Sequence, residues 1–297
     1  MYSNDCIHIT PLPPQLNNNN IKETPELFTF VNYMINKFTF PFEYSLIQVI
    51  TVIYNKPFSE TLNYLYNFIL KHKLADINQR NCYGNTILHI LLRNYSKDQF
   101  FSYINEGADP NIPNSFTKRT PTHFIFSVLN NEDIQKLIHK LDLSVISLYN
   151  ETIYYYASLN KGNILLYLLD NVHYDIDSLY QLTTYGKSIF SFNVNVKVDD
   201  IICKLHIVDN LNYIISNGQT LITHLCQCDT GINLGRYILY YLFNNNNELL
   251  VKLLERKDNK QKPPIFYLKS ISLYELALKF GVNANITNNN GINKLFN

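Results

Sequence analysis

Two groups of cysteine and histidine residues carry the side chains in this sequence that could bind a metal ion. Cys203 and His206 lie three residues apart, and His224, Cys226 and Cys228 alternate along one short segment. Cysteine and histidine at short spacing can complete a tetrahedral zinc site. Within a helix, however, Cys226 and Cys228 would point to different sides, and cysteine is also a good filler of tight core positions. We therefore expect no metal at these residues, and no cofactor elsewhere.

His89 and His123 are the other candidates for chemistry. Neither has a serine, cysteine or carboxylate at a spacing that would pair with it for nucleophilic catalysis. The sequence also has no Gly-x-Gly-x-x-Gly, no phosphate-binding loop and no His-Glu-x-x-His segment. We expect the chain not to be an enzyme. An enzyme with cryptic catalytic residues remains the alternative, because spatial pairing cannot be derived from spacing alone.

The composition restricts the classes of partner and the compartment. Of 297 residues, 46% are hydrophobic, and the formal net charge is +1. This balance disfavours nucleic acid and membrane surfaces as partners. Five scattered cysteines, no secretory signal and no apolar run of membrane-spanning length favour a soluble protein in the cytoplasm. The abundance of asparagine and tyrosine matches an AT-rich genome, as in intracellular bacteria, large DNA viruses and some protists.

The elements that would position these side chains are short helices in a regular series. Residues 1–24, rich in proline and asparagine, are expected to form a flexible tail, and residues 25–41 an N-terminal capping helix. Helix pairs fill residues 42–297, and the first pair is Tyr44–Tyr54 with Ser59–His72. Helix-opening residues then recur at steps of 34, 32, 36, 32 and 43 residues. They are Thr86, Thr120, Thr152, Ser188, Thr220 and Pro263.

The longest step, from Thr220 to Pro263, is expected to hold an insertion. We place it in loops, at Asn244–Asn247 and in the charged segment Glu255–Lys262, because repeat arrays tolerate insertions there.

This periodicity resembles that of the ankyrin repeat, whose period is about 33 residues. The segment from Gly84 to His89 and the Gly-Ala-Asp-Pro-Asn run that starts at Gly107 are similar to the opening and the closing turn of such a repeat. Fragments of the motif recur in later repeats, although Phe190, Ser191 and Thr223 depart from it. The resemblance implies an all-α solenoid of about seven helix-turn-helix repeats. It also implies that the motif histidines hydrogen-bond the opening threonine or nearby backbone.

In proteins of this family, the loop before each repeat, called a finger, lines the face that grips partner proteins. Aromatic and arginine side chains favour such interfaces. The finger positions give these candidate partner-binding residues: Arg80, Tyr83, Phe116, Lys118, Arg119, Tyr149, Tyr185 and Lys187. The competing interpretation is that tyrosine is common in this chain and packs finger against finger. The resemblance thus implies a non-catalytic scaffold for a protein partner, with no small-molecule substrate. The AT-rich composition favours a host-directed effector or host-range factor as its context, with a protist's own scaffold as the alternative.

Overall fold

The computed structural model describes residues 29, 68–69, 71–72, 75–93, 97–160, 164–192, 198–215, 218–228, 233–245, 247–258, 261–288 and 290–293. The predicted tail, the capping helix and most of the first helix pair lie outside these residues. The chain divides into two compact units, residues 1–116 and 117–297, which are described separately.

In the first unit, helices α4 (Ile87–Arg93) and α5 (Lys97–Asn105) pack against each other. Their contact buries Ile87, Leu91 and Phe100 almost completely. Gly107 ends the pair with a positive φ of 100°, and the N–H of Ala108 donates to the carbonyl of Tyr103 at 2.9 Å. This is the left-handed glycine cap that the sequence predicts there.

The second unit is a series of short α-helices and 3-10 helices (η). In chain order they are α6 (Pro121–Val128), α7 (Asn131–Leu137), η3 (Ile138–Lys140), α8 (Ile153–Leu159), α9 (Ile164–Asn171), α10 (Ile176–Tyr180), η4 (Ile189–Ser191), α11 (Val198–Lys204), α12 (Leu221–Gln227), α13 (Leu234–Asn245), α14 (Asn247–Glu255), η5 (Pro264–Tyr267) and α15 (Ile271–Lys279).

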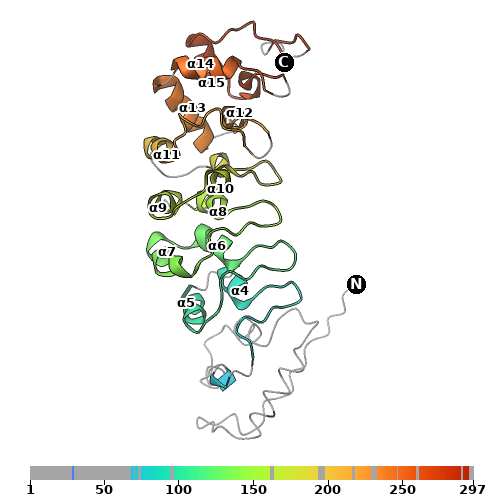
Figure 1. Cartoon of the computed structure of the whole chain (residues 1–297), viewed down its shortest axis with the longest axis vertical. Helices are drawn as coiled ribbons and strands as arrows, with labels where there is room; N and C mark the ends of the chain where they lie inside the picture. Colours follow the sequence, from blue (N-terminus) through green and yellow to red (C-terminus); the bar gives the residue numbers. More distant parts are fainter. Residues whose placement is uncertain are drawn as a thin grey trace. The chain divides into compact units, whose positions relative to one another are not determined.

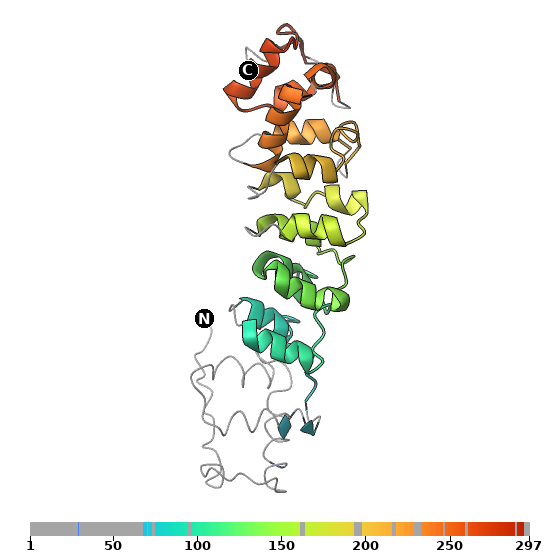
Figure 2. The same ribbon diagram turned by 90° about the vertical axis from the view of Figure 1, so that its left-hand side faces the viewer.

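Helix pairs of the second unit stack in chain order. The colours in Figure 2, which run along the sequence, show this order. Among the first helices of successive pairs, α6 packs on α8, α8 on η4, and α12 on η5. Figure 1 shows α7, α9 and α11 on one side of this row and the connecting loops on the other side. The described part of the second unit is therefore an all-α stack of helix pairs, and the described part of the first unit contains one such pair.

Every opening residue that the spacing identifies lies directly before a helix. Thr120 precedes α6, with Pro121 as its first residue, and Thr152 caps α8 by accepting the N–H of Tyr155. Thr220 does the same for α12, and Ser188 and Pro263 precede the short helices η4 and η5. Side-chain capping satisfies helix N–H groups that have no partner within the helix, which explains why these residue types recur at this position.

Stacking buries the apolar face of each second helix. On α9, Ile164, Leu165 and Leu168 are at most 1% exposed and Leu169 is 9% exposed. The amide of Asn160, just after α8, donates to the carbonyls of Phe126 and Leu129 at the end of α6, at 3.0 and 2.9 Å. Apolar burial and this polar contact together join one pair to the next.

The placement of the insertion in loops is wrong for Asn244 and Asn245, which end α13, and for Asn247 and Glu255, which begin and end α14. Helix α14 was not predicted. It packs against α12, α13 and η5, and its Leu250 and Leu254 are completely buried. Leu253 and Leu254 follow Leu250 by three and four residues, the spacing of one helix face, so this segment has an apolar stripe to bury.

The first helix of the fifth pair is also shorter than expected. η4 ends at Ser191, and the carbonyl of Phe192 accepts the N–H of Leu234 at 2.8 Å, at the start of α13. This tertiary bond uses a carbonyl that a longer helix would need for its own ladder. Helix α10 was not predicted, and it packs on α8.

Candidate protein-interaction surface

Tight hairpins lie before the first helices, and we call them finger loops: residues 81–85, 115–119, 147–151, 183–187, 215–219, 258–262 and 288–292. In the finger loop 147–151, the N–H of Ser147 donates to the carbonyl of Glu151, and the N–H of Asn150 to the carbonyl of Ser147, both at 3.0 Å. The same pair of bonds forms in loops 81–85, 183–187, 215–219, 258–262 and 288–292. The finger loops are therefore repeated, defined structures.

Two residue types explain the turn in the finger loops 81–85, 147–151, 183–187 and 288–292. The fourth residue has a positive φ, for example 74° at Gly84, 57° at Asn150 and 69° at Gly186, a region that glycine and asparagine adopt most readily. The first side chain accepts backbone N–H groups: Ser147 Oγ accepts those of Tyr149 and Glu151, at 3.1 and 3.2 Å. Asparagine, serine, threonine or aspartate with glycine or asparagine three residues later is thus a local signal for the turn.

Neighbouring finger loops are bonded to each other through their backbones. In the second unit, the N–H of Leu148 donates to the carbonyl of Thr117 at 2.8 Å, and that of Thr184 to the carbonyl of Tyr149 at 2.9 Å. In the first unit, the N–H of Ser115 donates to the carbonyl of Tyr83 at 3.2 Å. These bonds hold each row of loops before any partner arrives.

The predicted aromatic residues form two pairs, one in each unit. Tyr83 and Phe116 have ring centroids 6.0 Å apart, with 46% and 63% of each residue exposed. Tyr149 and Tyr185 are 5.7 Å apart, and Tyr185 is 70% exposed. The rings therefore pack finger against finger, as the competing interpretation holds, and they still present apolar surface to solvent.

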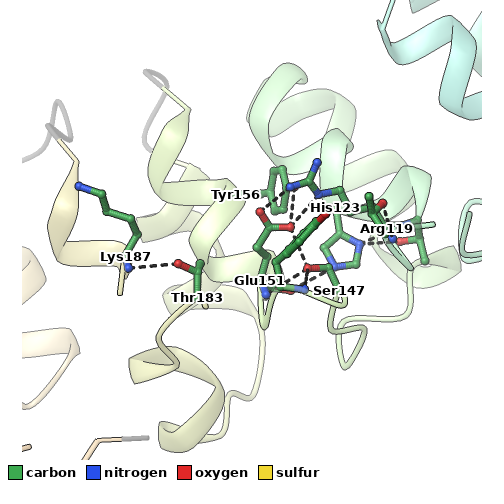
Figure 3. Close-up of polar contacts among 10 residues, drawn as sticks. Arg119, His123, Ser147, Glu151, Tyr156, Thr183 and Lys187 are labelled. Carbon is green, nitrogen blue, oxygen red and sulfur yellow. Dashed lines mark hydrogen bonds and ion pairs between the residues drawn. The ribbon is translucent and has the colours of Figure 1, made fainter. Parts of the chain in front are cut away.

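Arg119 has a structural task that the sequence interpretation missed. Its guanidinium donates to both carboxylate oxygens of Glu151, each at 2.7 Å, and lies over the Tyr149 ring at 5.3 Å. Glu151 also accepts hydrogen bonds from the hydroxyls of Ser147 and Tyr156, at 2.7 and 3.2 Å (Figure 3). The side chain of Glu151 is 5% exposed, so this ion pair joins two neighbouring finger loops from within the protein.

The pKa shifts match this network. Burial by itself would raise the pKa of Glu151, but the hydrogen bonds from Arg119 and Ser147 outweigh it, and the pKa is lowered from 4.5. The hydrogen bond to Glu151 raises the pKa of Arg119. Both charges are thus held in place, and each neutralises the other.

The remaining predicted residues are accessible. Arg80, Lys118 and Lys187 are exposed. Sequence reasoning missed the apolar side chains beside them in the second unit: Leu148 is 60% exposed, and Ile146 and Ile214 are 50% and 58% exposed. Their positions, within or next to finger loops, are the signal that could have identified them.

The motif histidines are structural. The backbone N–H of Thr120 donates to Nδ1 of His123 at 3.0 Å, and the hydroxyl of Thr120 lies 2.9 Å from the same nitrogen. Nε2 of His123 lies 3.2 Å from the carbonyl oxygen of Glu151. His89 makes the equivalent contacts with Thr86 at 3.1 and 3.0 Å. Because a backbone N–H donates to Nδ1, the ring is neutral with its proton on Nε2. The predicted bond to the opening threonine is confirmed.

Acidification should therefore destabilise the second unit. Burial lowers the pKa of His123 and of His224 to about 4, from an ordinary value of 6.5. Between these values the unfolded chain binds protons that the folded chain does not, so stability falls as the pH drops, by at most about 1.4 kcal/mol per pH unit for each histidine. Thermal melting between pH 8 and pH 4 measures this slope. A His123→Gln variant should lose part of it, whereas an unchanged slope would contradict the assignment.

The candidate metal ligands differ in their surroundings. Cys203 and His206 are exposed, whereas His224, Cys226 and Cys228 are buried on and just after α12. His224 Nε2 lies 2.7 Å from Ser188 Oγ and 3.5 Å from Cys228 Sγ. Over the part of the chain that the structure describes, no three histidine, cysteine or carboxylate side chains come together as a metal site.

No described helix has the length and apolar character needed to cross a membrane.

Comparisons with known proteins set a sequence relative and a solved structure beside this geometry. No family model matches the chain. A Rickettsia bellii (strain RML369-C) protein described as an ankyrin repeat protein is 38% identical over 92 residues, which are 31% of this chain and 54% of the relative. The match thus spans about half the length of that relative. The crystal structure of the ankyrin repeat domain of Bcl-3, a member of the IκB protein family, covers 85% of this chain and 93% of its own, at 14% identity and a TM-score of 0.44. By its repeat period, its finger loops and its threonine–histidine bonds, this chain resembles the ankyrin-repeat proteins and has their all-α repeat fold.

Proposed function

We propose that the chain is a non-catalytic scaffold whose finger loops bind a partner protein. The observation that carries this proposal is the row of exposed aromatic and apolar side chains on hydrogen-bonded hairpins. Tyr185 and Leu148 are more than half exposed, yet the backbone of each loop is tied to its neighbour. Interfaces draw most of their energy from a few such anchors. A loop that is already ordered loses less conformational freedom on binding.

The buried histidines do not support the enzyme alternative. Ser188 Oγ and His224 Nε2 are 2.7 Å apart, a distance suited to a nucleophile and its base. Ser188 is 0% exposed and His224 is 2% exposed, so a substrate cannot reach either side chain in this fold. We assign the pair a packing role between η4 and α12.

The proposed context is a host-directed effector or host-range factor in the cytoplasm of a host cell. It rests on the AT-rich signature of the composition and on similarity to a protein of Rickettsia bellii, an intracellular pathogen. Affinity capture from host-cell lysate and from source-cell lysate, compared by mass spectrometry, tests this context.

The variant Leu148→Ala/Tyr185→Ala should lose partner binding. Exposed side chains contribute little to folding, so its free energy of unfolding should change by only about 0.5 kcal/mol for each substitution. Loss of a hot spot costs about 2 kcal/mol, which corresponds to roughly a thirtyfold loss of affinity. Binding of the captured partner to immobilised wild type and variant, by interferometry, measures this loss.

Tyr237→Ala is the matched control, because Tyr237 is 44% exposed but lies on α13. Equal affinity of the finger-loop variant and this control would show that the binding face lies elsewhere.

A further inference from the structure

The accessible charge on the finger loops of residues 117–187 has a single sign. Their charged residues are Lys118, Arg119, Glu151 and Lys187. Glu151 is buried and its charge is taken up by Arg119, as described above. Lys118 and Lys187 are exposed. The accessible charge on these loops is therefore positive, and no carboxylate among them is accessible.

The exposed carboxylates of the same pairs lie outside these finger loops. They are Glu132 on α7, Asp142 after η3, Asp170 on α9, and Asp175 and Asp177 at α10. Figure 1 places α7 and α9 on the opposite side of α6 and α8 from the loops. The exposed carboxylates of these pairs thus lie outside the finger loops, whereas exposed lysines occur both on the loops and on α7.

Lys187 is positioned to meet a ligand. In Figure 3 its side chain extends away from Thr183 and from the Arg119–Glu151 pair, and the bond drawn to it is that of its backbone N–H to Thr183 Oγ1 at 3.1 Å. Burial, together with the positive charge of Lys187, contributes to the low pKa of His224.

Apolar side chains lie among these charges. Leu148 and Tyr149 belong to finger loop 147–151, and Tyr185 belongs to finger loop 183–187. Leu148 and Tyr185 are exposed. In the first unit, considered by itself, exposed Arg80 likewise accompanies the exposed rings of Tyr83 and Phe116. Both units thus offer cations beside apolar surface.

We propose that the finger loops of residues 117–187 recognise an acidic peptide segment of the partner protein, in which carboxylates flank an apolar or aromatic side chain. The apolar side chain packs against Leu148 and Tyr185, and the carboxylates approach Lys118 and Lys187. Complementary charge speeds association and rejects partners of the wrong sign. This inference rests on the proposed function, since it names the chemistry of the segment that the same loops bind.

The probe is a random peptide library displayed on phage, selected on the immobilised full chain. We expect selected peptides to contain more aspartate and glutamate than the input library, next to an apolar residue. One selected peptide, labelled with a fluorophore, is then titrated by anisotropy. Lys118→Glu/Lys187→Glu should lower its affinity by about tenfold or more, and binding to the wild type should weaken as salt is added.

Lys136→Glu/Lys252→Glu is the control, because it reverses the same number of exposed lysines on α7 and α14 and should leave the affinity unchanged. The acidic-segment inference would be overturned if the selected peptides were not enriched in acidic residues, or if Lys118→Glu/Lys187→Glu left their affinity unchanged. In either case the proposed function would still stand as long as Leu148→Ala/Tyr185→Ala abolishes binding. If that apolar variant binds as well as the wild type, or if the library yields no binder, the proposed function fails as well.

Discussion

Replacing Arg119 with alanine should lower the free energy of unfolding by about 3–5 kcal/mol, because it leaves a buried carboxylate without its counter-ion. The side chain of Glu151 is 5% exposed and that of Arg119 is 28% exposed, so solvent cannot fully replace the lost pair. The two remaining hydroxyl bonds, from Ser147 and Tyr156, cannot neutralise the charge. Urea unfolding followed by circular dichroism measures the loss.

Lys118→Ala is the matched control for Arg119→Ala, since Lys118 is the preceding residue and is exposed. It should change the stability by no more than about 0.5 kcal/mol. A second variant, Arg119→Ala/Glu151→Gln, should recover part of the loss because the unpaired charge is gone. Equal stability of Arg119→Ala and Lys118→Ala would show that the ion pair does not form.

Replacing Leu168 with alanine should cost about 2–5 kcal/mol. Leu168 is 0% exposed on α9, so the change removes buried methyl groups and leaves a cavity between packed helices. In a repeat array, stability is a sum of repeat and interface terms, and the loss should therefore appear as fraying around α8 and α9. Thermal melting and amide hydrogen exchange report the global and the local effect.

Leu249→Ala provides the same chemical change at a site on α14 that is 40% exposed. Its cost should be clearly smaller, because less apolar area leaves water at that position on folding. If the two leucine variants melt alike, the repeat assignment around α9 is wrong.

The helix openings could be predicted from sequence because they depend on local chemistry. Threonine, serine or proline directly precedes each first helix, and Gly107 supplies the left-handed residue that closes α5. Helix α14 and the early end of η4 could not be predicted in the same way. Helix α14 depends on the neighbouring helices that bury its apolar stripe. The end of η4 depends on the N–H of Leu234, which is distant in sequence and donates to the carbonyl of Phe192.

The candidate site was predicted in part. Counting finger positions identified Tyr149 and Tyr185, which the structure brings within 5.7 Å of each other. Arg119 was counted as a partner-binding residue, but its guanidinium is engaged by Glu151. The signal was present: both residues hold the fifth position of adjacent finger loops, where opposite charges come together across one repeat. Leu148 was missed because its exposure depends on the direction of the hairpin, which the apolar pattern alone does not give.

The central claim is that partners bind the finger loops, and amide hydrogen exchange of the full chain with and without its captured partner tests it most directly. Protection should be concentrated at residues 146–150 and 183–187, because those backbones lie under the exposed aromatic and apolar side chains. The helices α7, α9 and α11 should exchange as they do in the free chain. Protection confined to those helices, with unchanged exchange in the finger loops, would contradict the account.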